Sequence, residues 1–213
     1  THFTYYANEA SQGNNRGNLH TVVDALGHTT TFGDYNGFGQ ATSVTDANGM
    51  VTTRTYNLSG LMTAATSAGL TTGYTYTPAG RLQAVTLPGG RTISYTYNAA
   101  GRLAGVTDTL GNGITYSYDS EGRRTGEEVR DPNNTLARYA GFGYDDNGRL
   151  NTITLPGPAV ETSEYDLVGN LVKTVNATSQ QTEYQYDALN RLQSITEAGD
   201  SSASYTYDSH DNI

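Results

Sequence analysis

The chain has 213 residues with 12 Lys or Arg against 21 Asp or Glu, which gives a formal net charge of -9. This acidic balance argues against a nucleic-acid-binding protein, because such proteins usually present a basic surface. The absence of cysteine excludes a disulfide framework, thiolate metal sites and a cysteine nucleophile. No apolar run approaches the ~18 residues of a membrane-spanning helix, and we expect no signal peptide within this segment.

The residue types that are abundant favour an all-β fold with many turns. The chain contains 17 Tyr, 33 Thr and 25 Gly. Tyr and Thr fit pleated strands, whereas Gly supplies the backbone angles of tight turns. We therefore expect strands joined by short turns and almost no helix.

Internal repeats dominate the sequence. Similar units begin at Gly17, Gly39, Gly60, Gly80, Gly101, Gly122, Gly148 and Gly169, and Asn190 and Asp211 take the same place in the next two. The spacing is 20 to 22 residues, except for the unit from Gly122 to Gly148, which is longer by about five. We expect residues 1–213 to be a single continuous array of about nine units. The array is cut within a unit at both ends, as in a fragment of a longer chain.

Each unit is expected to fold as a β-hairpin. In the clearest unit, the first strand covers Leu82 through Thr86, the turn is Leu87-Pro88-Gly89-Gly90, and the return strand covers Thr92 through Tyr97. Pro and Gly favour such turns because they supply fixed or positive φ angles. A final Asp-x-x-Gly step turns the chain into the next hairpin, where the Asp side chain can accept backbone N–H groups. Because one hairpin cannot bury its own face, neighbouring hairpins should stack into a long, coiling antiparallel ribbon.

Tyrosines alternate at positions i and i+2 near the end of many units, for example Tyr95 and Tyr97. Both members of such a pair lie on one face of a strand, so we expect the rings to form a packed ladder. The first strand is less regular, because Leu82 and Val85 are three residues apart. Either a β-bulge brings these two side chains to one face, or both faces of the sheet are partly covered.

Turn-forming residues also predict turns at two further places. The irregular segment from Glu127 to Ala140, around Asp131-Pro132, is expected to be a lengthened turn, since the repeat resumes after it. Gly33 and the Gly37-Phe38-Gly39 sequence are also expected in turns.

No residue pattern points to catalysis or to a cofactor. The four histidines, His2, His20, His28 and His210, show no metal-ligand spacing, and no nucleophile elbow or phosphate loop occurs. We therefore expect no enzymatic activity, no cofactor and no metal site.

The repeated aspartates have a structural and a functional interpretation. The structural one is capping of turns and pairing with an arginine such as Arg102 or Arg191. The functional one is Ca²⁺ binding, for which Asp145-Asp146-Asn147 is the best local cluster, although Ca²⁺ takes about six to eight oxygen ligands.

The step Tyr-Asp-x-x-Gly-Arg-Leu resembles the YD repeat of Rhs proteins. It occurs as Tyr97-Asn98-Ala99-Ala100-Gly101-Arg102-Leu103, Tyr144-Asp145-Asp146-Asn147-Gly148-Arg149-Leu150 and Tyr186-Asp187-Ala188-Leu189-Asn190-Arg191-Leu192, and in a shorter form at Tyr118-Asp119-Ser120-Glu121-Gly122-Arg123. The resemblance extends over essentially the whole chain. The residues that carry the repeat are Tyr76, Gly80, Arg81, Leu82, Tyr95, Tyr97, Gly101, Arg102, Leu103, Tyr116, Tyr118, Asp119, Gly122, Arg123, Tyr144, Asp145, Gly148, Arg149, Leu150, Tyr184, Tyr186, Asp187, Arg191, Leu192, Tyr205, Tyr207 and Asp208.

This resemblance implies a secreted or cell-surface bacterial shell protein. Bacterial Rhs toxins, the cocoon components of Tc toxins and animal teneurins wind such repeats into a hollow shell, which in the bacterial toxins encloses a toxic domain. The implied function is a non-catalytic wall segment around a cargo polypeptide. The implied partners are further repeats of the parent chain, or identical copies at open sheet edges, and an enclosed polypeptide, with no nucleic acid and no membrane insertion. Asp131-Pro132 does not continue into the signature of the family's protease region, so we expect the protease and toxin to lie outside this segment.

Two other functions remain open at this stage. Open sheet edges could let identical pieces add head to tail into a filament or tube. Alternatively, rows of aromatic side chains could bind sugars, as in an adhesin or carbohydrate-binding module.

Overall fold

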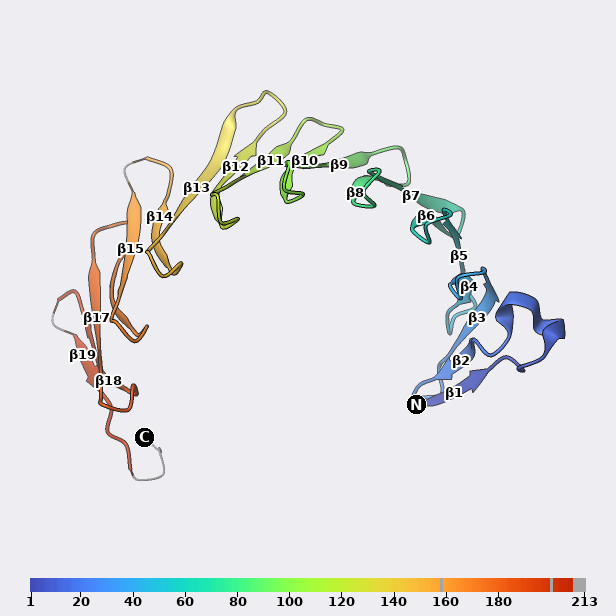
Figure 1. Ribbon diagram of the computed structural model, residues 1–213, viewed down its shortest axis with the longest axis horizontal. Helices are drawn as coiled ribbons and strands as arrows, with labels where there is room; N and C mark the ends of the chain where they lie inside the picture. Colours follow the sequence, from blue (N-terminus) through green and yellow to red (C-terminus); the bar gives the residue numbers. More distant parts are fainter. Residues whose placement is uncertain (158, 200, 209–213) are drawn as a thin grey trace. The chain divides into compact units, whose positions relative to one another are not determined.

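The computed structural model describes residues 1–157, 159–199 and 201–208 (Figure 1). The chain divides into two compact units, which are treated separately below. The first unit comprises Thr1–Thr96 and Thr107–Thr109, and the second comprises Tyr97–Val106 and Leu110–Ile213.

The first unit is a meander in which each strand pairs antiparallel with the next one. Its strands are β1 (His2–Tyr5), β2 (Leu19–Val23), β3 (Thr29–Tyr35), β4 (Ala41–Thr45), β5 (Val51–Tyr56), β6 (Met62–Ser67), β7 (Leu70–Tyr76), β8 (Leu82–Thr86) and β9 (Thr92–Tyr97), the last of which ends at the border of the unit. A short 3-10 helix, η1 (Ala10–Asn15), lies between β1 and β2.

The second unit continues the same pattern, with successive antiparallel pairs from β11 to β19. Its strands are β10 (Leu103–Asp108), which reaches the border of the unit, β11 (Gly113–Tyr118), β12 (Arg124–Arg130), β13 (Leu136–Tyr144), β14 (Leu150–Thr154), β15 (Val160–Tyr165), β16 (Leu171–Val175), β17 (Gln181–Tyr186), β18 (Leu192–Glu197) and β19 (Ser202–Ser204). The expected all-β hairpin repeat is therefore confirmed, and β8 and β9 have the predicted bounds.

Two local predictions were wrong. Gly33 lies within β3 and faces Ser43 of β4, so it belongs to a strand, whereas Gly37-Phe38-Gly39 does lie in a turn. The segment from Glu127 to Ala140 is mostly strand: β12 and β13 have 7 and 9 residues, and the turn between them covers only residues 131–135. The extra residues of this unit therefore lengthen its two strands, where they can join the hydrogen-bonded ladder, and not the turn. The helix η1 is a further irregular segment that the repeat pattern did not predict.

A β-bulge explains the irregular spacing in the first strand of each hairpin. Tyr76 pairs with Leu82 and Thr75 with Ala84, so Gln83 is the extra residue. The register then places Val85 opposite Tyr74, on the same face as Leu82. The same shift occurs before Tyr56, Tyr118, Tyr144, Tyr165 and Tyr186. Of the two explanations left open by the sequence, the structure contains the bulge.

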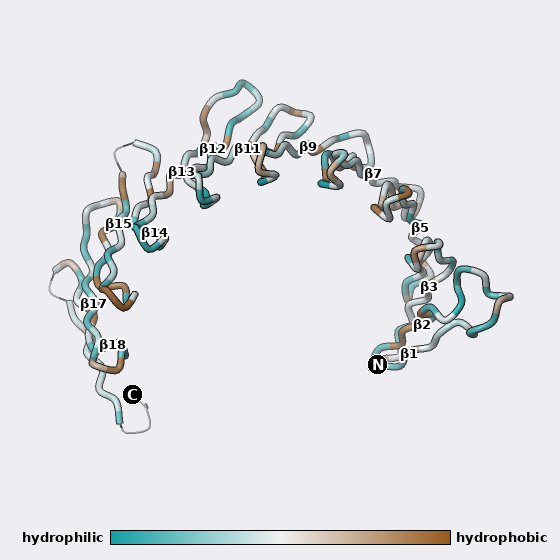
Figure 2. The backbone as a smooth tube through the Cα atoms, in the orientation of Figure 1, coloured by the Kyte–Doolittle hydropathy of each residue, from teal (hydrophilic) through white to brown (hydrophobic). Residues whose placement is uncertain are grey.

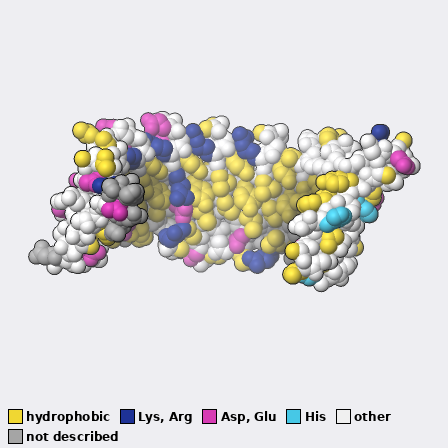
Figure 3. Space-filling model, turned by 90° about the horizontal axis from the view of Figure 1, so that it is seen from below, with side chains coloured by type: hydrophobic (Ala, Val, Ile, Leu, Met, Phe, Trp, Pro, Cys, Tyr) yellow, Lys and Arg dark blue, Asp and Glu magenta, His cyan; other side chains and the backbone are white. Residues whose placement is uncertain are grey.

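The bulges give the sheet two chemically different faces. The apolar face carries, among others, Phe32, Val44, Tyr74, Val85 and Ile93 in the first unit and Phe142, Ile153, Tyr184, Ile195 and Ala203 in the second. The opposite face, called the threonine face, carries Thr31, Thr45, Thr53, Thr66 and Thr86 in the first unit and Thr152, Thr162 and Ser194 in the second. Hydrophilic (teal) and hydrophobic (brown) segments both occur along the backbone of each unit in Figure 2, and Figure 3 looks onto a face where hydrophobic side chains gather.

The sheet is a single layer, so the expected ladder of tyrosine rings has no second layer to pack against. Among the described residues only Gly105, Gly126 and Gly141 are buried, and no hydrophobic side chain is. Tyr116 and Tyr118 are half-buried. A ladder of rings can pack along one face, but without a second layer each ring keeps one side open to solvent.

Apolar side chains also project from the tips of several turns. Leu58 is 96% exposed, Leu167 105% and Leu189 69%. Their exposure shows that these tips contribute nothing to packing within either unit.

Candidate functional site

The residues that define the repeat gather at the turns between hairpins. In the turn at Asp187, the N–H of Asp187 donates to the carbonyl of Arg191 (2.9 Å), and the N–H of Asn190 donates to the carbonyl of Asp187 (3.0 Å). Oδ1 of Asp187 accepts the N–H groups of Leu189 (2.8 Å) and Arg191 (3.0 Å). One carboxylate oxygen thus closes the turn with two backbone bonds.

The same geometry recurs at both ends of the hairpins. The side-chain oxygen at the first position accepts the N–H groups two and four residues later in turns that begin at Asp24, Asn36, Asp46, Asn57, Asp131, Asp145, Asp166 and Asn176. Asn serves as well as Asp because only one acceptor oxygen is needed.

Where an arginine follows an Asp four residues later, as at Asp119, Asp145 and Asp187, the second carboxylate oxygen binds that arginine. Nε of Arg123 lies 2.7 Å from Oδ2 of Asp119, Nε of Arg149 lies 2.7 Å from Oδ2 of Asp145, and Arg191 pairs with Asp187 in the same way. The hydrogen bond from the Arg123 guanidinium holds the pKa of Asp119 below its ordinary value. The backbone N–H and then the side chain of Arg191 do the same to the pKa of Asp187.

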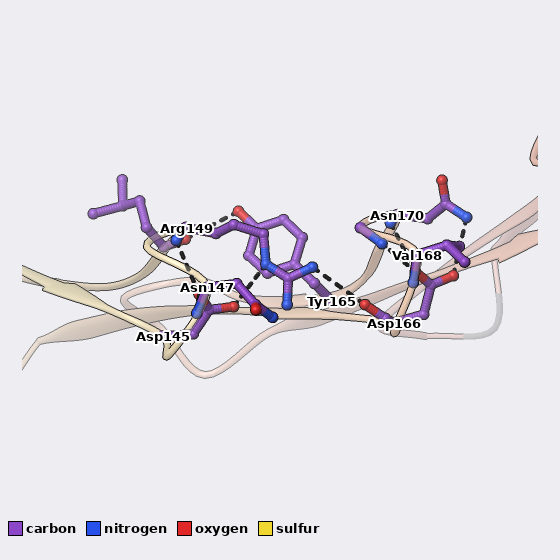
Figure 4. Close-up of polar contacts among 9 residues, drawn as sticks. Asp145, Asn147, Arg149, Tyr165, Asp166, Val168 and Asn170 are labelled. Carbon is purple, nitrogen blue, oxygen red and sulfur yellow. Dashed lines mark hydrogen bonds and ion pairs between the residues drawn. The ribbon is translucent and has the colours of Figure 1, made fainter.

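The arginine also reaches the following turn, as Figure 4 shows for Arg149. Its guanidinium lies over the ring of Tyr165, 4.6 Å from the centroid, and Nη1 donates to the carbonyl of Asp166 at 3.2 Å. Arg123 covers Tyr144 at 4.7 Å, and Arg191 covers Tyr207 at 4.5 Å. Each contact joins a charge to an aromatic face, a pairing that stabilises by electrostatic attraction to the ring.

The tyrosine completes the link by reaching back to the start of the first strand of its own hairpin. The hydroxyl of Tyr165 donates to the carbonyl of Leu150 (3.0 Å), which directly follows Arg149 in the chain. The same bond runs from Tyr118 to Leu103, from Tyr144 to Arg124 and from Tyr207 to Leu192, and in the first unit from Tyr35 to Leu19, from Tyr56 to Ala41 and from Tyr76 to Met62. Asp, Arg and the next Tyr therefore form one repeated contact, here called the Asp–Arg–Tyr contact.

The glycine of the turn is required for two reasons. Gly122 has a φ of 89°, which disfavours a side chain, and a Cβ at this position would lie 2.0 Å from Nη2 of Arg102. The arginine of one turn thus lies against the glycine of the next. Asn190 takes the glycine position with a φ of 60°, and its side chain accepts a hydrogen bond from Asn170 at 3.0 Å.

Turns without an arginine use other side chains for the same purpose. Nε2 of Gln40 donates to the carbonyl of Gly60 at 2.8 Å. Leu61 lies 3.8 Å from the place where a Cβ of Gly80 would stand. In each of these examples, the side chain four residues after the start of the turn reaches the following turn, whether it is charged, polar or apolar.

The structure brings most of the predicted repeat residues into these contacts. The exceptions are aromatic residues of the strand interior, such as Tyr95 and Tyr184, which lie on the apolar face away from the turns. Asp208 is described, whereas Asp211 and His210 lie outside the described residues.

The histidines and the proposed calcium cluster have identified surroundings. His28 pairs with Asp24 at 2.9 Å, and the His20 ring lies 4.3 Å from that of Tyr6. Oδ1 of Asp145 accepts two backbone N–H groups and Oδ2 accepts Nε of Arg149. Within the described part of the chain, no cluster of three or more His, Asp or Glu could hold a metal ion.

One charged cluster was missed by the sequence analysis. Arg124 lies 3.0 Å from Glu127, which also pairs with Arg138, and the Arg124 guanidinium lies over the ring of Phe142 at 4.8 Å. The strand register places all of these side chains on the apolar face. The signal was present in the sequence as charges at positions that are apolar in other units, but it could be interpreted only once the bulges had fixed the register.

The family model described as Teneurin YD-shell matches residues 4–171. The chain belongs to the teneurin YD-shell family. A second model, RHS Repeat, matches residues 165–202. A comparison with curated proteins gives no match.

Solved structures share the YD-shell fold at low sequence identity. A crystal structure of TcdB2-TccC3-Cdc42 is 18% identical with a TM-score of 0.76 and covers 97% of this chain. TcdB2-TccC3 without its hypervariable C-terminal region is 18% identical with a TM-score of 0.75 over 99% of this chain. The Tc holotoxin pore of Photorhabdus luminescens, with the TccC3 mutation D651A, is 19% identical with a TM-score of 0.72 over 92%. This YD-shell segment spans only 12 to 13% of those chains.

None of its described helices is long and apolar enough to cross a membrane.

Proposed function

We propose that this YD-shell segment is a non-catalytic wall element of a secreted shell and that its apolar face is turned toward an enclosed polypeptide. The observation that carries the proposal is a single-layer sheet with one apolar face and no buried hydrophobic side chain among the described residues. Such a face is unfavourable in water, so a covering partner would be stabilised by its burial.

The accessible surface supports a wall rather than a globular domain. The chain exposes 13520 Å². A compact monomer of 22.8 kDa would expose about 9,600 Å² on the usual scaling of surface with mass. The excess of accessible surface is expected for a one-layer sheet, because neither face is covered by a second layer. The apolar face is therefore available to a partner.

Electron microscopy of the intact, native protein that contains this segment tests the proposal. Closed hollow particles with internal density are the expected result. Extended fibres of regular pitch would overturn it and favour a self-assembling filament.

A labelling experiment identifies which face is enclosed. Because the segment has no cysteine, Ile195→Cys on the apolar face and Ser194→Cys on the threonine face introduce unique thiols at half-buried neighbours in β18. In the native particle, a bulky maleimide should modify position 194 and spare position 195. Equal labelling at both positions, with both variants assembling normally, would contradict an enclosed apolar face.

A further inference from the structure

The aromatic ladder on the apolar face is interrupted at one strand of the second unit. Two residues before the last tyrosine of a strand, the chain has an aromatic side chain at Tyr116, Phe142, Tyr184 and Tyr205. In β15 this position is Ser163, which pairs with Thr174 of β16. Two small hydroxyl side chains therefore occupy the place where other hairpins carry a ring.

The interruption leaves a hollow of about 170 Å³. Of its lining side chains, Leu150, Ile153, Glu161, Ser163 and Thr174 belong to the apolar face by their register. Small-molecule sites usually measure about 300–1,000 Å³, whereas a cavity of about 150 Å³ accommodates a molecule of the size of benzene. The hollow therefore has about the volume of one side chain and is smaller than most small-molecule sites.

A carboxylate faces this hollow without a partner. Glu161 is half-buried, and in the part of the chain that the structure describes its carboxylate forms no hydrogen bond or ion pair. The nearby cation Lys173 lies on the threonine face, where its Nζ is 3.7 Å from Glu164. The exposed carboxylate of Glu164 thus has a cation beside it, whereas the half-buried carboxylate of Glu161 is open to a partner.

We propose that the hollow receives one basic side chain, arginine or lysine, from the polypeptide that covers the apolar face; this rests on the proposed function. The aliphatic stem would lie on Leu150 and Ile153, and the charged head would reach Glu161. Charge complementarity selects a cation over an uncharged ring, because only a cation adds the attraction of opposite charges to its hydrogen bond with the carboxylate. An acidic side chain is excluded by repulsion.

Peptide titration of the full chain, followed by NMR amide shifts in β14, β15 and β16, tests the inference. The probes are the blocked tripeptides Gly-Arg-Gly, Gly-Lys-Gly, Gly-Tyr-Gly and Gly-Glu-Gly. The basic peptides should bind saturably with dissociation constants in the millimolar range, and added salt should weaken them. Glu161→Gln should weaken that binding by about tenfold or more, whereas Glu164→Gln, on the opposite face of the same strand, should leave it unchanged.

A second variant tests the hollow itself. Ser163→Tyr restores the ring found in other hairpins, so it should fold normally, fill the hollow and abolish the shifts caused by the basic peptides. Stronger binding of the tyrosine peptide, or basic-peptide binding that survives Ser163→Tyr or Glu161→Gln, would overturn the assignment. Because these measurements need no assembled particle, their failure would leave the imaging and labelling results of the proposed function untouched.

Discussion

At the scale of single residues, the aspartate at the first position of a turn such as Asp187 has two roles, one for each carboxylate oxygen. Oδ1 closes the turn, and Oδ2 holds the arginine. The chain itself contains the relevant comparison, because Asn57 closes its turn in the same way without an arginine partner.

We therefore expect Asp187→Asn to lower the melting temperature less than Asp187→Ala. The asparagine retains the acceptor for the N–H groups of Leu189 and Arg191 and loses only the charge pair, whereas alanine loses both. Thermal unfolding followed by circular dichroism gives the ranking. Equal effects of the two variants would show that backbone closure by Oδ1 contributes nothing.

The aspartates also predict how stability depends on pH. The pKa of Asp119 and that of Asp187 are lowered by hydrogen bonds from Arg123 and Arg191. For Asp145, partial desolvation raises the pKa, but the N–H groups and guanidinium of Arg149 outweigh it. In the unfolded chain an aspartate has a pKa of about 3.9. Because the folded state binds fewer protons, this stabilisation is complete above pH ~5 and is lost as the pH falls through the lowered pKa values.

Urea unfolding at pH 7, 5 and 3 measures this dependence. The midpoint should change little between pH 7 and 5 and fall at pH 3. The triple variant Asp119→Asn, Asp145→Asn and Asp187→Asn should show a smaller fall. An unchanged fall would assign the acid sensitivity to other carboxylates.

At the scale of the hairpin, the tyrosine at the end of the return strand is bonded to the start of the first strand of the same hairpin. The hydroxyl of Tyr165 donates to the carbonyl of Leu150 at 3.0 Å. Tyr184 also lies on the apolar face, but its hydroxyl forms no such bond within the described residues. The two tyrosines therefore differ in bonding while sharing the same sheet face.

Replacing each tyrosine by phenylalanine should separate ring from hydroxyl. Tyr165→Phe should reduce the free energy of unfolding by about 1 kcal/mol, because a part-buried hydrogen bond is lost and the ring remains. Tyr184→Phe should change it by less than about 0.5 kcal/mol. Chemical denaturation of both variants provides the comparison, and equal losses would mean that the hydroxyl bond does not stabilise the base of the hairpin.

At the scale of the whole molecule, the contacts within each unit join a strand only to the strand before or after it, apart from a contact between β3 and η1, in the part that the structure describes. Stability in such an array is a sum of hairpin and nearest-neighbour terms. A weakened contact should therefore act locally.

Hydrogen exchange of Tyr165→Phe tests this locality. Amides of β14, β15 and β16 should exchange several-fold faster, since about 1 kcal/mol corresponds to roughly fivefold, while those of β11 stay unchanged. Equal acceleration over the whole second unit would indicate a cooperative domain instead.

Much of this architecture could be predicted because the repeat is local. Turn residues, strand alternation and a period of about 21 residues identified the hairpins, and the bounds of β8 and β9 followed directly. Gly33 was misassigned because composition alone does not distinguish a turn glycine from one that faces Ser43 within a ladder. The strands β12 and β13 were misassigned because the Asp-Pro and Asn-Asn pairs of their short turn masked the strand residues around it.

The amino-acid sequence by itself determined the hairpins, their order and the chemistry of every turn, because these depend on residues a few positions apart. Only the tertiary structure decided which side chains share a face, because a single bulged residue such as Gln83 changes the side of every residue beyond it. It also decided that Arg149 covers the ring of Tyr165, a contact across one repeat that no local pattern specifies. The open apolar face and the hollow at Ser163 follow from that register.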